Sequence, residues 1–376
     1  MASSKRKKEK YLRYAPHRDV VFVLGAGTSH PDGVPLQEHI LPMILSGKIS
    51  EIADSVIGKQ VAAFMTDNFF IDPDRAEYPK LEAVFGFLDH FIQQNESLSA
   101  AYPNEKLREI KENLIKLIHY IVDLRTDKGS QTYHLFWKAV QTYNRNVSII
   151  TLNYDTLLEQ AFDFLFPEQG YIDYCIPLMN YLDVHQLSEF GFWINPREPI
   201  VVGNGQDPVS YKIIKIHGSL NWKYCNCCNQ TLLTPWDRKI DLDRGKLIGH
   251  TFPGQAEYDY YCPLDGTEFQ TLIMPPSYVK SLANPVIAQL FSEASREIRL
   301  TQKIVFVGYS LSDADVHIKA LFKKHLGKDV ELVVVNIKDP VELRQTYCAL
   351  SKNVCFLKNS FEEMVNSDQL MAELLS

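Results

Sequence analysis

A buried strand that ends in a glycine turn constrains this chain more than any other stretch of its sequence. The run Val20–Leu24 (VVFVL) is apolar throughout, which is typical of a strand covered on both faces of a parallel sheet. Gly25-Ala26-Gly27 follows at once, and glycine allows a sharp turn and a close approach to the backbone. Backbone N–H groups in such a turn can bind an anion, so we expect a nucleotide diphosphate there. The alternative is a plain strand-to-helix turn, because His30 stands where the dinucleotide fingerprint has its third glycine.

The same order of strand, turn and helix recurs along the chain. We expect further strands at 147–151, 211–216, 271–274, 303–307, 330–335 and 354–357. We expect helices at 36–46, 132–143, 156–165, 284–299, 314–323 and 361–375, and one more after Pro340. This alternation predicts an α/β fold with a Rossmann-like, doubly wound parallel sheet formed by residues 18–48, 127–222 and 271–376.

Two segments interrupt the alternation, and a basic segment precedes it. Residues 49–126 show apolar positions at helical spacing and are predicted to be a helical insertion. Residues 223–270 are polar and contain cysteines, which predicts a small zinc-ribbon-like insertion. Residues 1–17 contain the basic run Lys5–Lys8 and are predicted to be a flexible tail, with a phosphate or partner contact as the alternative.

Polar side chains follow two of the expected strands directly. Asn153 and Asp155 come after the strand 147–151, and His217 comes after the strand 211–216. Ligands of open α/β sheets gather at the carboxyl ends of the strands, so these three residues are candidates for catalysis. Alternatively, Asp155 caps the next helix, and His217 is a structural, hydrogen-bonded histidine.

The cysteines indicate a possible metal site. Cys225 and Cys228 have the C-x-x-C spacing of a zinc knuckle, whereas the second half offers Cys262 and Asp265. Three thiolates and a carboxylate can bind zinc, and a ribbon that has lost its metal is the alternative. The odd total of seven cysteines favours a reducing compartment over a disulfide framework.

Composition limits the classes of partner. The formal net charge of −7 argues against a general nucleic-acid-binding protein. No apolar stretch reaches the length of a transmembrane helix, and no apolar segment follows the basic N-terminus as in a signal peptide. We therefore expect a soluble cytoplasmic protein without membrane contact.

Four segments taken together resemble the sirtuin-like superfamily. They are GAGTSHPDGVP (25–35), TLNYDTLLE (151–159), KIHGSLNW (215–222) and GYSLSDAD (308–315). The chain looks most like the bacterial antiphage-defence branch, whose members degrade NAD. The resemblance implies a Rossmann-like domain with a smaller inserted domain, with NAD as the substrate.

The resemblance also implies roles for individual residues. The residues that it places at the phosphates and riboses of NAD are Gly25, Ala26, Gly27, Ser29, Gly308, Ser310 and Asn336. It further implies that Pro35 shapes the loop over the nicotinamide end and that Asn153 and Asp155 contact nicotinamide and its ribose. His217 matches the catalytic histidine.

Departures from the deacylating sirtuins affect the expected reaction. Leu152 replaces a glutamine, Tyr154 replaces an isoleucine, and Leu36-Gln37 follow Pro35 in place of Asp-Phe. These changes favour an NAD⁺ hydrolase that releases nicotinamide and ADP-ribose over a protein deacylase or ADP-ribosyltransferase. A non-catalytic NAD- or ADP-ribose-binding regulatory subunit is the further alternative. Similar chains of this branch work with a HerA-type hexameric ATPase, so we expect that partner and homo-oligomers, with residues 49–126 as the interface.

Overall fold

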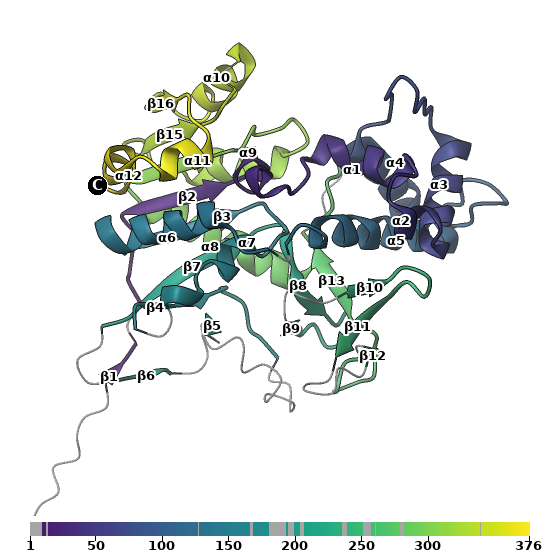
Figure 1. Ribbon diagram of the computed structural model, residues 1–376, viewed down its shortest axis with the longest axis horizontal. Coiled ribbons are helices and arrows are strands. Elements are labelled where there is room, and N and C mark those ends of the chain that lie inside the picture. Colours follow the sequence, from purple (N-terminus) through teal and green to yellow (C-terminus); the bar gives the residue numbers. More distant parts are fainter. Residues whose placement is uncertain are drawn as a thin grey trace, which may run out of the picture.

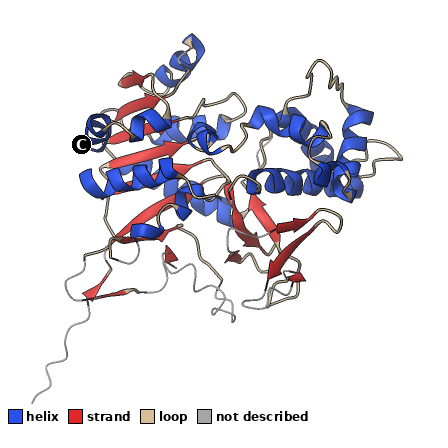
Figure 2. Ribbon diagram, in the orientation of Figure 1, coloured by secondary structure: helices blue, strands red, loops and turns tan. Residues whose placement is uncertain are grey.

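The computed structural model describes most of the chain (Figures 1 and 2). The described residues are 10–12, 14–126, 128–165, 168–179, 193–194, 199–203, 207–234, 239–250, 257–259, 261–278, 282–338 and 340–376. The basic run at residues 5–8 lies outside them. Within the described part, no helix combines the length and the hydrophobicity needed to cross a membrane.

An eight-stranded sheet forms the centre of the molecule, and all of its strand pairs are parallel. Its order is β16 (Val354–Leu357), β15 (Glu331–Val335), β14 (Lys303–Val307), β2 (Val20–Leu24), β3 (Val147–Thr151), β7 (Val209–Lys215), β4 (Gly170–Asp173) and β5 (Trp193–Ile194). The central strand β2 is buried at every residue, as expected for a strand covered on both faces. The predicted doubly wound parallel sheet is confirmed.

Helices cover both faces of this sheet, with α6 in front and α8 behind in the view of Figure 1. One packed group consists of α6 (Gln131–Tyr143), α7 (Leu157–Gln160), α11 (Phe361–Val365) and α12 (Asp368–Leu375). The other contains α8 (Pro285–Leu300) and α9 (Val316–His325), while α10 (Val341–Cys348) lies beside β16. A doubly wound sheet needs such cover on each side because its strands are apolar on both faces.

A separate group of helices lies to one side of the sheet (Figure 2). It contains α1 (Gln37–Leu45), α2 (Ser50–Ala53), α3 (Val56–Asn68), α4 (Leu81–Gln94) and α5 (Asn104–Asp123). The apolar stripes that predicted these helices are buried, including Leu88 on α4 and Leu117 on α5. They belong to the same hydrophobic core as the strands of the parallel sheet.

Small antiparallel sheets adjoin these helices. One has the order β13 (Gln270–Ile273), β8 (Gly218–Tyr224), β9 (Thr231–Leu233). Another has the order β10 (Lys239–Asp241), β11 (Lys246–His250), β12 (Glu257–Asp259). Near the N-terminus, β1 (Lys10–Tyr11) pairs with β6 (Val201–Val202), so part of the segment predicted as a tail forms a strand. The antiparallel sheet begins at Gly218, directly after His217.

Some predicted elements differ in extent. The helix expected at 156–165 is the short α7 followed by a 3-10 turn at Asp163–Leu165. The helix expected at 361–375 is divided, because Ser367 caps α12 by accepting a hydrogen bond from the Leu370 N–H. The strand expected at 271–274 belongs to an antiparallel sheet rather than to the parallel one.

Candidate functional site

The candidate residues gather at one edge of the parallel sheet. The strands β15, β14, β2, β3 and β7 are neighbours and run parallel, so the turns that follow them share the carboxyl edge. The chain leaves β2 toward β3 and later returns on the other side of β2 as β14. This reversal makes the β2–β14 boundary a topological switch point, the usual position of a ligand crevice in such sheets.

Two glycine turns pack backbone against backbone at this boundary. A Cβ on Gly27 would lie 2.8 Å from both the Cα and the carbonyl oxygen of Gly308. Gly308 has a φ of +59°, which favours glycine. The N–H groups of Gly25 and Gly27 donate to the carbonyls of Val307 and Gly308. The glycines therefore serve the contact between the two turns.

The glycine turn at residues 25–29 differs from the expected phosphate site, which would need backbone N–H groups without a partner. Besides Gly25 and Gly27, the N–H groups of Thr28 and Ser29 donate to the carbonyls of Gly25 and Ala26. The physical reason is that residues 26–28 form a tight 3-10 turn, which satisfies its own backbone. Ala26 is exposed and Ser29 is buried.

Asn153 holds this turn in place. Its buried Nδ2 lies 3.1 Å from the carbonyl oxygen of Gly25 and 3.0 Å from the hydroxyl oxygens of both Thr28 and Ser29. Tyr133 of α6 adds its hydroxyl, 2.8 Å from that of Thr28 and 3.0 Å from that of Ser29. Sequence reasoning missed Tyr133, because no motif links α6 to the glycine turn.

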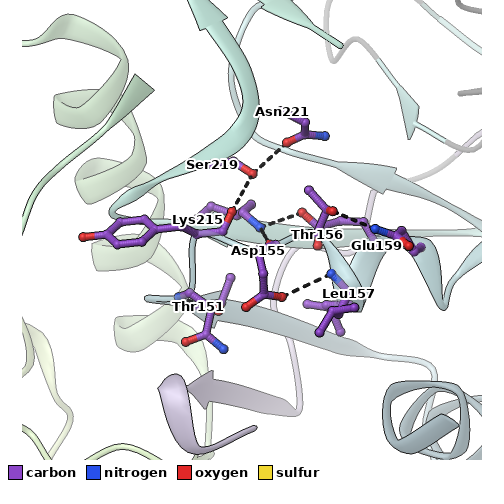
Figure 3. A network of polar contacts seen from close by, with 12 residues as sticks. Thr151, Asp155, Thr156, Leu157, Glu159, Lys215, Ser219 and Asn221 are labelled. Carbon is purple, nitrogen blue, oxygen red and sulfur yellow. Dashed lines mark hydrogen bonds and ion pairs between the residues drawn. The ribbon is translucent and has the colours of Figure 1, made fainter. Parts of the chain in front are cut away.

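Asp155 and the end of β7 are joined by a buried network (Figure 3). Oδ1 of Asp155 accepts the N–H of Leu157 at 3.1 Å, which is the helix-capping contact considered above. Lys215 donates from Nζ to the carbonyl oxygen of Asp155 at 2.5 Å and to Oε1 of Glu159 at 2.8 Å. Burial raises the pKa of Glu159, and the charge of Lys215 opposes this effect.

His217 lies buried between β7 and β8, next to the loop that carries Asn153 and Asp155. The ring of Tyr154 in that loop is 6.4 Å from the ring of His217, measured between centroids. The hydroxyl of Tyr154 donates to the carbonyl of Met274, whose N–H donates to the carbonyl of His217. These contacts place all three predicted catalytic residues around one loop junction.

A second histidine meets His217. Nε2 of His317, the second residue of α9, lies 2.8 Å from Nε2 of His217. Asp315, the N-cap residue of α9, accepts hydrogen bonds from Tyr309 at 2.9 Å and from Ser312 at 3.0 Å. Sequence reasoning missed His317, although it stands two residues beyond the GYSLSDAD segment. The signal that could have found it is its position in the first turn of a helix at the carboxyl edge of the sheet.

The remaining predicted residues lie around the same edge. Ser310 is exposed in the turn after β14, and Pro35 is half-buried just before α1. Asn336, after β15, donates from Nδ2 to the carbonyl of Tyr309 at 3.5 Å. Asn336 therefore contacts the turn that contains Gly308.

The three cysteines and the aspartate considered as candidate zinc ligands form one cluster in the antiparallel part of the molecule. One ligand atom from each of Cys225, Cys228, Cys262 and Asp265 lies within 4.8 Å of the others. Sγ of Cys228 is 3.7 Å from that of Cys262, and Sγ of Cys225 is 3.3 Å from Oδ2 of Asp265. Burial raises the pKa of the Cys228 thiol to about 12. A bound cation would offset this cost of forming thiolates, and the donor set fits tetrahedral zinc.

A known protein family matches part of the chain. The family model of the SIR2-like domain matches residues 147–330, which include β3, β7 and β14. This match supports the sirtuin-like superfamily that the four motifs suggested. No curated protein matches the sequence significantly.

Solved structures of Sir2 proteins superpose on the chain with low similarity. A Sir2 homologue in complex with NAD has 12% identity and a TM-score of 0.47, over 97% of this chain and 96% of that one. A mutant Sir2 homologue with 2′-O-acetyl ADP-ribose has 13% identity and a TM-score of 0.46, over 94% and 91%. A mutant with ADP-ribose has 12% identity and a TM-score of 0.44, also over 94% and 91%. At these values, the superpositions do not assign a function.

Proposed function

We propose, on the premise that residues 147–330 form a SIR2-like domain, that this chain binds NAD⁺ and hydrolyses its nicotinamide–ribose bond. The products are nicotinamide, ADP-ribose and a proton, with one water molecule consumed. The observation that carries the proposal is one loop at the carboxyl edge of the sheet. It holds Asn153 against the glycine turn and the ring of Tyr154 against that of His217, and Asp155 is the next residue of the same loop.

The reaction makes modest demands on the protein, and these residues suit them. Nicotinamide leaves as a neutral group from a cation, so no strong general acid is needed. Positive charge builds on the ribose, where the carboxylate of Asp155 is the proposed electrostatic partner. His217 is the proposed base that takes a proton from a ribose hydroxyl or from water. Asn153 is the proposed partner of nicotinamide and also anchors the glycine turn.

The first experiment measures NAD⁺ loss by the purified full chain and identifies the products by mass. We expect nicotinamide and ADP-ribose, or its cyclic form, without any added peptide. His217→Ala is expected to lower the rate by about 10²- to 10⁴-fold, as for loss of a positioned acid–base group. The matched control is His90→Ala, an exposed histidine on α4. Wild-type rates in a folded His217→Ala protein would reject the assignment of the base.

Asn153→Ala requires a stability measurement beside the rate. Its amide contacts Gly25, Thr28 and Ser29, so the substitution removes buried hydrogen bonds, at a cost of roughly 1–3 kcal/mol. A rate loss that persists well below the unfolding temperature supports a role in the reaction. A rate that falls only in proportion to the folded fraction would mean that Asn153 stabilises the loop and takes no part in the reaction.

The same assay separates the alternatives. NAD⁺ loss that requires an acyl-lysine peptide or a protein acceptor identifies a deacylase or ADP-ribosyltransferase. Intact NAD⁺ under all conditions, together with tight binding of NAD⁺ or ADP-ribose, identifies a non-catalytic binding subunit.

We further propose that NAD⁺ depletion serves bacterial antiphage defence and that activity depends on assembly. The proposed partners are further copies of this chain and a HerA-type hexameric ATPase, with the helices α2–α5 as the interface. The assay is therefore run with and without the product of the neighbouring gene, and crosslinks are mapped in the complex. Crosslinks that avoid α2–α5 would reject this interface without affecting the hydrolase proposal.

A further inference from the structure

His217 and His317 meet head-on. Their Nε2 atoms are 2.8 Å apart and their ring centroids are 5.1 Å apart, with 29° between the ring planes. The centroid separation is close to the nitrogen–nitrogen distance plus the two ring radii, so both nitrogens lie near the line that joins the rings. One nitrogen must donate and the other accept, so the pair shares a single proton.

The separation fits a hydrogen bond rather than two ligands of one metal ion. Two nitrogens at about 2.0–2.1 Å from a tetrahedral zinc would stand roughly 3.3 Å apart. The two side chains therefore have the geometry of a hydrogen bond, with one proton between the two nitrogens.

The surroundings of the pair determine where positive charge is tolerated. His317 lies in the first turn of α9, where the helix dipole disfavours a cation. A carboxylate oxygen of Asp315 lies within 4.8 Å of one ring nitrogen of each histidine and opposes that effect. The ring of Tyr154 faces His217, and the ring of Phe291 on α8 lies 5.8 Å from that of His317.

We propose that His317 is a positioning residue for His217, which fixes its tautomer and shares the charge that it acquires as a base. His217 donates its Nε2 proton to Nε2 of His317, so the accepting nitrogen of His217 is Nδ1. When a ribose hydroxyl or water loses its proton to Nδ1, the shared proton shifts toward His317, beside Asp315. The catalytic part of this inference rests on the proposed hydrolase, whereas the pairing is a property of the free protein.

Histidine nitrogen NMR of the full chain tests the pairing without substrate. Spectra of ¹⁵N-histidine protein, assigned with His217→Ala and His317→Ala, report which ring nitrogen carries the proton. We expect the Nε2–H tautomer for His217 in the wild type and a mixture of tautomers in His317→Ala. A proton on Nδ1 of His217, or the same mixture in both proteins, would overturn the proposal.

Steady-state rates test the catalytic part. We expect His317→Ala to lower kcat by at least about tenfold while the KM for NAD⁺ changes little, a smaller loss than that of the base itself. His317→Gln should recover part of kcat, because its amide can also donate and accept hydrogen bonds. His325→Ala, on the same helix, is the control. An unchanged kcat in His317→Ala overturns the positioning role. A wild type without turnover refutes the proposed hydrolase, and the NMR experiment then still decides whether the two histidines are paired.

Discussion

Nζ of Lys215 lies 2.8 Å from Oε1 of Glu159, and both side chains are at most 1% exposed. The same ammonium group binds the carbonyl of Asp155. A buried ion pair adds little net stability, yet removal of one partner leaves an uncompensated charge. The pair therefore connects β7 to α7, and the bond to Asp155 connects β7 to the loop after β3.

The first prediction concerns this pair. Lys215→Met is expected to lower the free energy of unfolding by about 3–5 kcal/mol, because Glu159 stays buried without its partner. Lys215→Met with Glu159→Leu should recover most of that loss. Urea denaturation measures both, and Lys106→Met at the half-exposed pair with Glu109 is the control, expected within about 1 kcal/mol. Equal losses in the single and double variants would contradict this account.

The second prediction concerns the paired glycine turns. Gly27→Ala is expected to destabilise the protein by about 1–3 kcal/mol, because its Cβ would meet the backbone of Gly308. Gly129→Ala is the control, since nothing lies within 4 Å of the added Cβ. Thermal unfolding distinguishes the two. If both variants unfold at the same temperature as the wild type, the two turns do not make the backbone contact described.

The sequence was sufficient for the elements whose signals are local. The strands at 147–151 and 303–307 were predicted to the residue, because runs of valine and isoleucine ended at turn residues. The glycine turns and the cysteine cluster followed from short motifs in the same way. Chemistry at the carboxyl edge could be expected because parallel strands share that edge.

Elements that depend on distant partners were not predictable. The strand β4 has only four residues in a stretch rich in turn formers, and its parallel pairing with β7 defines it. Gly218–Tyr224 was not among the expected strands, yet it is a strand because Gln270–Ile273 pairs with it. His217 and His317 are 100 positions apart, so their contact needs the complete sheet.

The third prediction concerns the cysteine cluster, for which we propose zinc. The wild type is expected to bind about one zinc ion per chain and to lose thermal stability with a chelator. Cys228→Ser should abolish the bound metal and the chelator effect. Cys227→Ser is the control, because this exposed neighbour is outside the cluster. Metal analysis by mass spectrometry provides the count, and a wild type without metal that resists chelator would favour a ribbon that has lost its metal.

The fourth prediction concerns Lys223 of β8, whose charge acts on His119 of α5. Its buried Nζ donates to the carbonyl of Leu220 at 2.7 Å, and burial lowers its pKa from 10.5 to about 7. Between those two values the unfolded chain binds the proton and the folded chain does not, so folding stability rises with pH through that window. Below pH 7 the cost of charging the buried group is fully present.

Lys223→Met should remove this dependence. The stability of the wild type relative to Lys223→Met is expected to rise by up to about 1.4 kcal/mol per pH unit between pH 7 and 10. Denaturant unfolding at several pH values measures the difference. Lys128→Met, an exposed lysine, is the control and should follow the wild type at every pH. Parallel curves of stability against pH for the wild type and Lys223→Met would mean that Lys223 keeps its proton when the protein folds. Water or a counter-charge would then have to reach Lys223 in the contact between α5 and β8.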